Sequence, residues 1–513
     1  MSRLSRNLIA ALACAAALLA NPAQAKPSAP ETLGDEVVYH IFTRSMRDSN
    51  GDGEGDLRGI QQSLPYLQKL GVTTILLTPL YPSHVNHNYF ATNFEGIDPE
   101  YGTMEDFRAL VREIHRRKMR ILLDMEFQYI VDDHPWWKAA KADPKSPFAD
   151  YMLWEDRAKG IAEKGPFDLR VIEHFGKNTH GVTTVNLKAE PVKAYFDKYL
   201  HDWVDPNRDG KFDDGVDGFR LDHMMDDLDL RGLLTSLFTD FWKPRFDKLR
   251  TVNPRLTFVA EQWDWGYGAD FLTVGDTDAV FAFPIHDAIR KFDKAALVTA
   301  IERTATLTPA GKHQFVFAEN HDVSRLASDK GMTPERLRTA ATLMMFLKGT
   351  PIIYYGQELG TPGVIDSGYK TDESAIAVRE AFQWDATEAS PRHAIWYRNP
   401  AERYWNNRFG RDNDGISVAE QDGDAKSLLN HYRRIAGLRR TFGALRTGDQ
   451  RVITSVPELL VIERKQSSKT FLLVANLSDK PANFDDVRAG KELIGNGGRQ
   501  LRPWQSALYA IQN

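Results

Sequence analysis

The sequence has little cysteine, no basic block and no apolar run long enough to cross a membrane. A single cysteine, Cys14, occurs among 513 residues, so no intramolecular disulfide supports the fold. The formal net charge of -5 gives no electrostatic basis for binding nucleic acid. Hydrophobic residues make up 42% and charged residues 26%, which is the balance of a soluble globular protein. This composition excludes a largely disordered, collagen-like or multi-spanning membrane chain.

The first 25 residues have the pattern of an export signal. Arg3 and Arg6 precede an apolar run over 8–20, whose length of about 13 residues is too short to span a bilayer. Ala23-Gln24-Ala25 then forms an A-x-A cleavage pattern before Lys26. We therefore expect residues 1–25 to be a cleaved signal peptide and the mature protein to be periplasmic or secreted. A membrane anchor, or a lipoprotein modified at Cys14, is the alternative.

Short apolar runs alternate with segments of helical periodicity along most of the chain. Candidate strands occupy residues 37–42, 73–80, 120–125, 216–222, 256–261, 278–283, 313–319 and 350–356. Candidate helices occupy residues 57–69, 103–118, 191–203, 229–250, 285–303, 334–347 and 426–441. Eight strand–helix units in order predict a parallel (β/α)8 barrel, with a doubly wound open sheet as the alternative.

Two long connections between predicted elements, and a change to short strands near the C-terminus, predict the domain organisation. The gap at about 127–190, after the third strand, is too long for a simple connection and predicts an inserted B domain. A second long gap, about 357–425, follows the eighth strand. Short strands with turns between them begin near residue 446. We expect a catalytic barrel over 26–445 and a small C-terminal β-sandwich over 446–513.

Three predicted strands end in, or shortly before, an acidic residue. Asp222 ends the fourth strand, Glu261 the fifth, and Asp322 follows the seventh. In a (β/α)8 barrel the carboxyl ends of all the strands meet at the face that carries chemistry. Arg220 lies two residues before Asp222, so both point to one side of the strand, and a guanidinium there favours the ionised carboxylate. Paired carboxyl groups of this kind are the usual equipment for cleaving glycosidic bonds.

The segments around these acids resemble the α-amylase family of retaining glycoside hydrolases. GVDGFRLD (215–222), VAEQW (259–263) and FAENHD (317–322) are similar to the family's fourth-, fifth- and seventh-strand blocks. The resemblance implies a (β/α)8 barrel with a B domain and a C-terminal sandwich. It further implies that Asp222 is the nucleophile, Glu261 the acid/base, and Asp322 a third acid that holds the sugar. Arg220 and His321 would then be substrate-side partners of these acids.

Other substrate-binding residues follow from the same resemblance. Tyr89, in HNYFATNF (87–94), is similar to a family tyrosine that stacks under the reacting sugar. The third-strand block departs from the family's Asp-x-x-x-Asn-His, because DMEFQY (124–129) has Gln128 and Tyr129 in the last two positions. Tyr129 can still donate one hydrogen bond. Arg379, in REAFQW (379–384), either faces the sugar site or is a surface charge.

Alternating oxygen side chains near the first strand predict a calcium site. The loop DSNGDGEGD (48–56) offers four such side chains and the carbonyl of Glu54, and Gly53 permits a tight turn; the candidate ligands are Asp48, Asn50, Asp52, Glu54 and Asp56. The loop is similar to the family's first-loop calcium site. An EF-hand and a plain turn are the alternatives. A possible second ion would use Asp205, Asn207, Asp209 and Asp213.

The sequence thus predicts an enzyme that cleaves α-glucosidic bonds in malto-oligosaccharides or starch-like glucans. The stretch over 132–156 resembles family members that act on short oligosaccharides. A transglycosylase or isomerase would use the same Asp222 and Glu261, and a non-catalytic sugar-binding relative is the third hypothesis. Linkage, endo or exo action and oligomeric state are left open.

Overall fold

The structure is a computed structural model that describes Pro30 and residues 32–173, 179–365, 372–397, 411–453, 458–486 and 488–511. The predicted signal peptide, 1–25, lies outside the described residues. No helix in the described ranges is long and apolar enough to cross a membrane.

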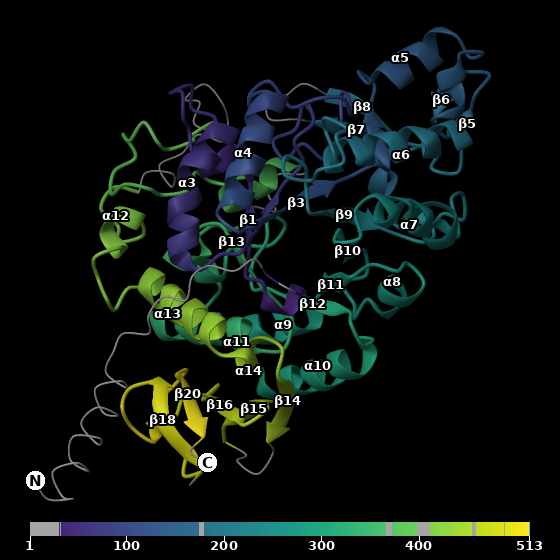
Figure 1. Ribbon diagram of the computed structural model, residues 1–513. Coiled ribbons are helices and arrows are strands. Elements are labelled where there is room, and N and C mark those ends of the chain that lie inside the picture. The colour runs from purple at the N-terminus through teal and green to yellow at the C-terminus, as the bar shows by residue number, and fades with distance from the viewer. Residues whose placement is uncertain are drawn as a thin grey trace, which may run out of the picture.

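Eight parallel strands close into a barrel (Figure 1), in the order β1-β13-β12-β11-β10-β9-β3-β2. Every neighbouring pair is parallel, which confirms the predicted (β/α)8 barrel and makes the open-sheet alternative wrong. Most strand residues are buried, because helices cover the outside and side chains fill the inside. The strands are β1 (Val38–Ile41), β2 (Thr74–Leu77), β3 (Arg120–Met125), β9 (Gly218–Met224), β10 (Thr257–Gln262), β11 (Ala279–Phe281), β12 (His313–Val316) and β13 (Thr350–Tyr354).

Helices surround the barrel, and several of them begin at capping residues that the sequence supplies. The side chain of Asp56 accepts from Gly59 N at the start of α3, and Thr103 forms a capping box with Asp106 at the start of α4. The larger helices are α3 (Leu57–Leu70), α4 (Met104–Arg116), α6 (Glu190–Val204), α7 (Lys243–Val252), α9 (Phe283–Lys291), α10 (Lys294–Leu307), α11 (Pro334–Phe346) and α13 (Leu428–Thr441). Shorter helices are α2 (Thr43–Met46), α8 (Ala269–Thr273), α12 (Val418–Gln421) and α14 (Gly443–Arg446).

Two predicted helices differ from the observed ones. The helix expected over 229–250 begins only at Phe238, as a π-helical turn over Phe238–Trp242 that continues into α7. Asp229 instead has a positive φ of 56° and turns its carboxylate toward the barrel mouth, where Tyr129 and Arg231 bind it. The helix expected over 285–303 is two helices, α9 and α10, because the chain turns at Phe292 with φ 52°.

A lobe of small sheets stands beside the barrel between β3 and α6 (Figure 1). Its main sheet has the order β4-β8-β7, with both pairs antiparallel. β4 follows β3 after only three residues, so the lobe is fixed directly to the carboxyl end of the barrel. The elements are β4 (Tyr129–Val131), α5 (Pro135–Ala142), β5 (Trp154–Asp156), β6 (Ile161–Ala162), β7 (Val171–Glu173) and β8 (Thr179–Thr184).

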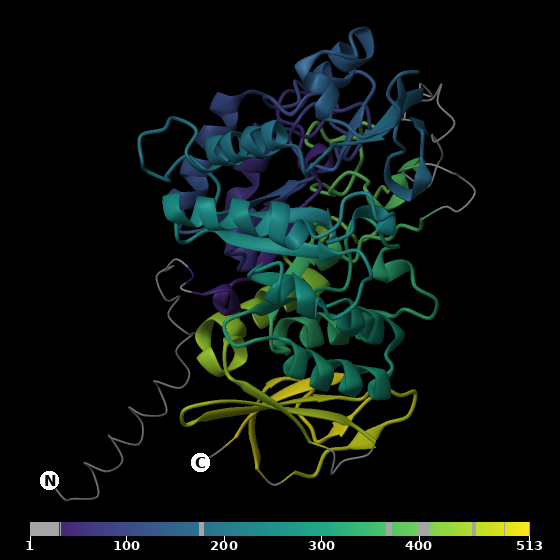
Figure 2. The same ribbon diagram turned by 90° about the vertical axis from the view of Figure 1, so that its right-hand side faces the viewer.

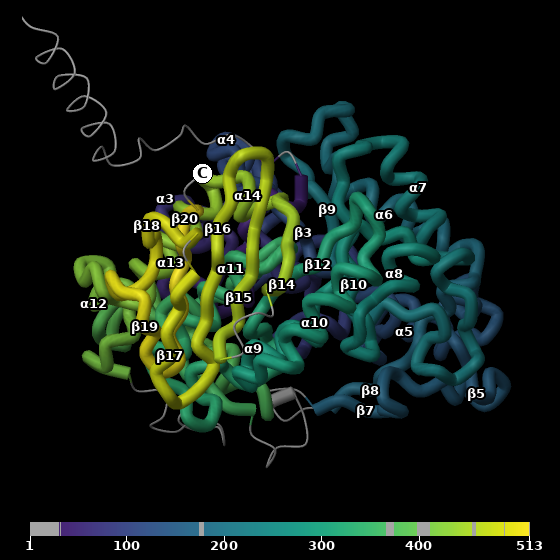
Figure 3. Tube along the Cα trace, turned by 90° about the horizontal axis from the view of Figure 1, so that it is seen from below, coloured from purple at the N-terminus to yellow at the C-terminus, as the bar shows by residue number. Residues whose placement is uncertain are grey.

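The C-terminal segment forms two antiparallel sheets beneath the barrel (Figures 2 and 3). The larger has the order β14-β15-β16-β20-β18 and the smaller pairs β17 with β19. Alternate residues of β15 enter different cores: Ile462 packs with the barrel helices, whereas Val461 packs with Leu501 of the smaller sheet. The strands are β14 (Asp449–Ile453), β15 (Leu460–Gln466), β16 (Lys469–Ala475), β17 (Ala482–Asn483), β18 (Ala489–Ile494), β19 (Gln500–Leu501) and β20 (Ser506–Ile511).

Candidate active site

Three adjacent barrel strands bring their polar residues together at the carboxyl end. Asp124 of β3 is the register partner of Arg220 of β9, and Val259 of β10 pairs with Arg220 on its other side. Asp222 and Glu261 each lie two residues farther toward the carboxyl ends of β9 and β10. Because side chains two apart on a strand share a face, this register directs the four polar side chains to one point.

A single guanidinium joins these carboxylates. Nη1 of Arg220 donates to Asp124 Oδ1 at 2.8 Å and to Asp222 Oδ1, while Nη2 lies 2.9 Å from Glu261 Oε2. Tyr89 Oη donates to the other oxygen of Asp124 at 2.6 Å. Arg220 and Asp124 are buried. The planar fork of an arginine suits this task, because it reaches several carboxylates at fixed angles.

Burial governs the protonation of the cluster. It raises the pKa of Asp222 well above its ordinary value; the charges of Glu261, Asp124 and Asp322 add to this, and Arg220 opposes it. Burial also raises the pKa of Asp124 to about 6, against the attraction of Arg220. Arg220 lowers the pKa of Asp222, as the sequence predicted, but burial and the neighbouring carboxylates outweigh this effect. One guanidinium among three carboxylates leaves an excess of negative charge, which favours the protonated form of Asp222 and Asp124.

A second group of predicted residues forms the neighbouring wall of the site. The rings of Tyr89 and His321 stack, with centroids 5.3 Å apart and planes 15° from parallel. Nε2 of His321 lies 3.1 Å from Asp322 Oδ2. Arg379 is buried rather than a surface charge, and its Nη2 donates to Asp322 Oδ1 at 3.4 Å while its Nε donates to the carbonyl of His321 at 3.1 Å. The structure thus brings Asp322, His321, Tyr89 and Arg379 beside the carboxylate cluster.

In the altered third-strand block, Gln128 and Tyr129 both form hydrogen bonds within the protein. Gln128 Nε2 donates to the carbonyls of Asp222 at 2.8 Å and His223 at 3.0 Å, so it fixes the backbone that carries the predicted nucleophile. Tyr129 borders the cavity, but its hydroxyl donates to Asp229 Oδ1 at 2.7 Å. The hydrogen bond that Tyr129 was expected to offer a sugar is therefore given to Asp229.

Glu126 is a buried acid of the site that the sequence reasoning did not select. It borders the cavity, and its Oε1 accepts from the backbone N–H groups of Gln128 and Tyr129. Its Oε2 is buried and has no hydrogen-bond partner within the described chain. Burial raises the pKa of Glu126 well above its ordinary value, and the nearby charge of Asp222 adds to this. The sequence signal was present, since an acid one residue past the end of a buried strand is unusual.

These residues border a cavity of about 420 Å³ at the mouth of the barrel. The lining combines these polar groups with several aromatic side chains. Trp263 and Trp265 lie two and four residues after Glu261 and are each 43% exposed. Trp265 stacks on Phe283 with centroids 4.8 Å apart. Flat aromatic faces beside a carboxylate pair suit a sugar ring, which has an apolar face and a polar edge. The lining also includes His87, Phe90, Pro166, Phe167 and His223.

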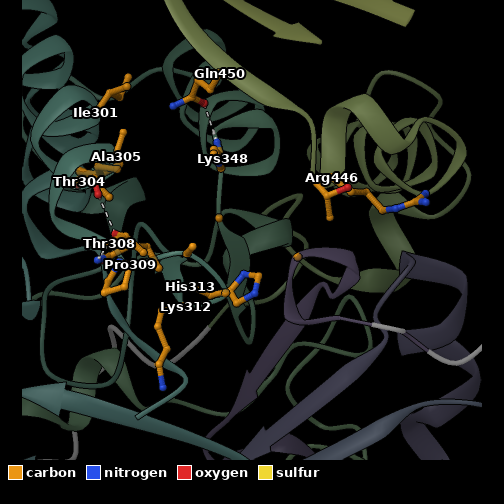
Figure 4. A pocket seen from close by; sticks show the side chains of 17 residues that line it. Ile301, Thr304, Ala305, Thr308, Pro309, Lys312, His313, Lys348, Arg446 and Gln450 are labelled. Atoms are coloured by element: carbon orange, nitrogen blue, oxygen red, sulfur yellow. Dashed lines mark hydrogen bonds between the residues drawn. The ribbon is translucent and has the colours of Figure 1, made fainter. Parts of the chain in front are cut away.

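Another cavity, of about 240 Å³, lies at the opposite end of the barrel (Figure 4). Its walls come from α10, from the starts of β12 and β13, and from the segment that leads into β14. Its lining includes Ile301, Ala305 and Pro309 and contains no carboxylate. The paired carboxyl groups that cleave glycosidic bonds are therefore absent from this lining.

The first predicted calcium loop is closed by its own hydrogen bonds. Both oxygens of Asp48 accept backbone N–H groups, from Asn50 and Gly51 on Oδ1 and from Gly53 on Oδ2. Glu54 lies 2.8 Å from the guanidinium of Arg44, and the carboxylate of Asp56 caps α3 and also accepts from Ser49. No three acids of this loop bring ligand atoms within 4.8 Å of one another. The side chains of Asn50 and Asp52 are exposed. The loop is thus a preformed turn whose side-chain oxygens are hard ligands of the kind that calcium binds.

The second predicted loop repeats this geometry. Asp205 accepts from the N–H groups of Asp209 at 3.2 Å and Gly210 at 2.9 Å, and Asn207 Oδ1 accepts from Asp209 N at 3.0 Å. The carboxylate of Asp209 accepts from the N–H group of Lys211, whose ammonium lies 3.5 Å away. A lysine at this position lowers the attraction of the second loop for a cation.

Comparison with known proteins places these observations in a family. Residues 40–448 match the alpha-amylase family, described as "Alpha amylase, catalytic domain". The chain belongs to the alpha-amylase family. It is similar to the 4-alpha-glucanotransferase of Thermotoga neapolitana, at 27% identity over 88% of this chain and 98% of that protein. It is also similar to the oligo-1,6-glucosidase of Heyndrickxia coagulans, at 26% identity over 93% and 98%.

A solved structure agrees with this assignment. The crystal structure of the alpha-amylase from H.orenii superposes with a TM-score of 0.75 at 25% identity, covering 93% of this chain and 97% of that one. The matched range includes the barrel, except the first two residues of β1, and the lobe between β3 and α6. The family resemblance noted from the sequence, and the glycosidase class that it implies, are confirmed.

Proposed function

We propose that the protein is a retaining α-glycoside hydrolase that cleaves α-glucosidic bonds in malto-oligosaccharides or starch-like glucans. The observation that carries this proposal is the contact of one guanidinium, that of Arg220, with both Asp222 and Glu261 on neighbouring barrel strands. A retaining mechanism needs two carboxyl groups close together across one sugar ring.

The proposed reaction uses the cluster in two steps. Glu261 gives its proton to the glycosidic oxygen while Asp222 attacks the anomeric carbon, and the leaving sugar departs with that proton. A covalent glycosyl–enzyme ester forms at Asp222. Glu261 then removes a proton from water, and the resulting attack on the ester releases the sugar with its original configuration. The raised pKa of Asp222 belongs to the empty site, where Arg220 still favours the ionised form that attacks the sugar.

The wall of Tyr89, His321, Asp322 and Arg379 supports the transition state in this proposal. Asp322 and His321 are placed to bind ring hydroxyls, and the stacked ring of Tyr89 offers an electron-rich face to the developing positive charge. Arg379 orients Asp322 and so acts as a positioning residue.

Glycosyl transfer to a sugar is the second candidate function. The exposed faces of Trp263 and Trp265 next to Glu261 form a platform on which an acceptor sugar can stack, and a glucanotransferase is among the relatives. A sugar-binding protein without activity is less well supported, because Asp222 and Glu261 are both present and in contact with Arg220.

Product analysis separates these functions. Maltotriose, isomaltose, sucrose and soluble starch would each be incubated with the protein, and the products and their anomers followed with time. Hydrolysis predicts shorter sugars released as the α-anomer, and transfer predicts longer ones in addition. Release of the β-anomer, or no product from any of the four, would overturn the proposal.

We also propose that the loop with Asp48, Asn50, Asp52, Glu54 and Asp56 binds one structural calcium ion. A bound ion would fix the loop between β1 and α3 and take no part in the reaction. Chelation should lower the Tm and added calcium restore it; an unchanged Tm would contradict the site. The same experiment on Asp209→Asn tests the second loop.

We further propose that residues 1–25 direct export to the periplasm or medium and are then cleaved. A mature N-terminus other than Lys26 would contradict the predicted cleavage.

A further inference from the structure

A group of two histidines and an aspartate lies at the edge of the lobe, outside the catalytic cluster. His84 follows β2, Asp133 follows β4, and His180 belongs to β8. It is the only group of three His, Cys, Asp or Glu side chains, among the residues that the structure describes, whose ligand atoms all lie within 4.8 Å of one another.

The ligand atoms of this group lie close together. Nε2 of His84 lies 2.9 Å from Asp133 Oδ2, and Nδ1 of His180 lies 3.8 Å from the same oxygen. The imidazole rings are stacked, with centroids 4.0 Å apart and planes 10° from parallel. Because a nitrogen lone pair lies in the plane of its ring, one ring has to turn out of this stack for both nitrogens to bind one ion. Ligands of a tetrahedral zinc ion are about 3.3 Å apart, given a Zn–N distance of about 2.0–2.1 Å. The two observed distances bracket this value.

The backbone holds these side chains in place. β4 and β8 are paired, and the loop that carries His84 is joined to β4 by bridges from Ser83 to Ala91 and from Ala91 to Ile130. Asp132 adds a second carboxylate: its Oδ1 lies 3.0 Å from His180 Nδ1 and its Oδ2 accepts from Gly181 N at 2.9 Å. The site is therefore assembled by the fold rather than by flexible surface side chains.

We propose that His84, Asp133 and His180 bind a divalent transition-metal ion of the zinc class, with Asp132 as the neighbouring carboxylate. Two imidazoles with a carboxylate suit zinc, cobalt or nickel, whereas calcium and magnesium take oxygen ligands. The ion joins the loop after β2 to β4 and β8, close to His87 and Tyr129 of the catalytic cavity. It stabilises the lobe against the barrel mouth and does not enter the glycosidic reaction.

One charge competes with the metal and provides a sharp test. The ammonium of Lys138, on α5, lies 2.7 Å from Asp133 Oδ1 and draws on the charge of that carboxylate. Lys138→Ala should therefore tighten metal binding. A gain of affinity cannot result from misfolding, so this variant separates the proposal from a general loss of structure.

The experiment uses the full mature chain without an affinity tag, stripped of metals and then kept in calcium so that oxygen sites are filled. Zn²⁺ binding is measured by equilibrium dialysis with metal analysis, and Co²⁺ binding by its visible absorption. We expect one Zn²⁺ per chain, and binding at least about tenfold weaker in His84→Gln and in His180→Gln. His115→Gln is the matched control, because His115 has a similar contact with Asp217 at 2.9 Å but belongs to no such group of three ligands among the described residues. Its affinity should be unchanged.

Absence of saturable Zn²⁺ binding would overturn the proposal. So would equal affinity in the wild type and both histidine variants, or a Lys138→Ala variant that binds Zn²⁺ more weakly. Because the readout is binding, these results are independent of whether the protein hydrolyses glucans.

Discussion

The two ends of the barrel contain cavities of opposite character. At the carboxyl end, Asp124, Asp222 and Glu261 surround one guanidinium and share an excess of negative charge. At the amino end the cavity lining has no carboxylate and is built from aliphatic, threonine and a few basic side chains (Figure 4). The same strands border both ends, so the difference comes from which residues stand at their last positions. A barrel of this kind separates the chemistry from the stability of the fold.

Removing either predicted reacting group should have the largest effect. We expect Asp222→Asn and Glu261→Gln each to lower kcat on the order of 10⁴-fold or more, as loss of a nucleophile does in other covalent mechanisms. The Tm of Asp222→Asn should be unchanged or higher, because the substitution removes a charge that burial disfavours. Steady-state kinetics and thermal unfolding measure both effects. Near-normal turnover in either variant would contradict the assigned roles.

Replacing the shared guanidinium should reduce activity and stability together. Arg220→Lys keeps the positive charge, but one ammonium cannot reach all three carboxylates that Nη1 and Nη2 contact. We expect a loss of about 10²–10³-fold in kcat, the size found when one aligned electrostatic contact is removed from an active site. A lower Tm should accompany it, because buried carboxylates lose their partner. Full activity with lysine would show that the fork geometry is unimportant.

Glu126 should make stability depend on pH in a way that its amide does not. Below the ordinary value of 4.5 this residue is protonated in both the folded and the unfolded chain. As pH rises, the unfolded chain loses the proton first, so the free energy of unfolding falls by about 1.4 kcal/mol per pH unit until the raised pKa is reached. Glu126→Gln lacks this loss.

The Tm of Glu126→Gln should therefore match the wild type near pH 4 and exceed it increasingly toward neutral pH. Thermal unfolding at a series of pH values measures the difference. A constant difference at every pH would show that Glu126 ionises normally in the folded protein.

Two threonine-to-valine variants in the cavity at the amino end, Thr308→Val and Thr304→Val, should show the smallest effects on stability and none on catalysis. Thr308 Oγ1 donates to the Thr304 carbonyl at 2.7 Å and accepts from Gln314 at 3.0 Å, whereas Thr304 Oγ1 is buried without a partner in the described chain (Figure 4). Thr308→Val should destabilise by about 1–2 kcal/mol, and Thr304→Val should be neutral or slightly stabilising. Denaturant unfolding compares them. A change in kcat in either variant would break the separation of the two ends.

The sequence predicted the barrel well because local signals agreed with the fold. The third strand was placed at its observed bounds, 120–125, since an apolar run that is buried on both faces reads the same locally and in the barrel. Asp222 and Glu261 were found from their positions at strand ends. The irregular start of the segment after β9 was missed, because Asp229 is held by Tyr129 and Arg231, and such contacts leave no local pattern.

Long-range groups marked the limit of sequence reasoning. His84, Asp133 and His180 are separated by 49 and 47 residues, so no metal-binding spacing connects them. Glu126 was visible only as an acid just past the end of a buried strand. The raised pKa of Asp222 left no sequence signal, because it depends on burial and on Glu261 and Asp124, which come from other strands. Candidate site residues could be selected from the sequence, but the environment that they share in the folded protein could not be predicted.

The most direct test of the central claim is capture of the covalent intermediate. An activated fluorinated α-glucoside, which slows the second step, would be added to the wild-type protein, and the digested chain examined by mass spectrometry. The account predicts one glycosyl unit, attached to the peptide at Asp222. A glycosyl unit on any other residue, or turnover of the reagent with no accumulated adduct and release of the β-anomer, would contradict it.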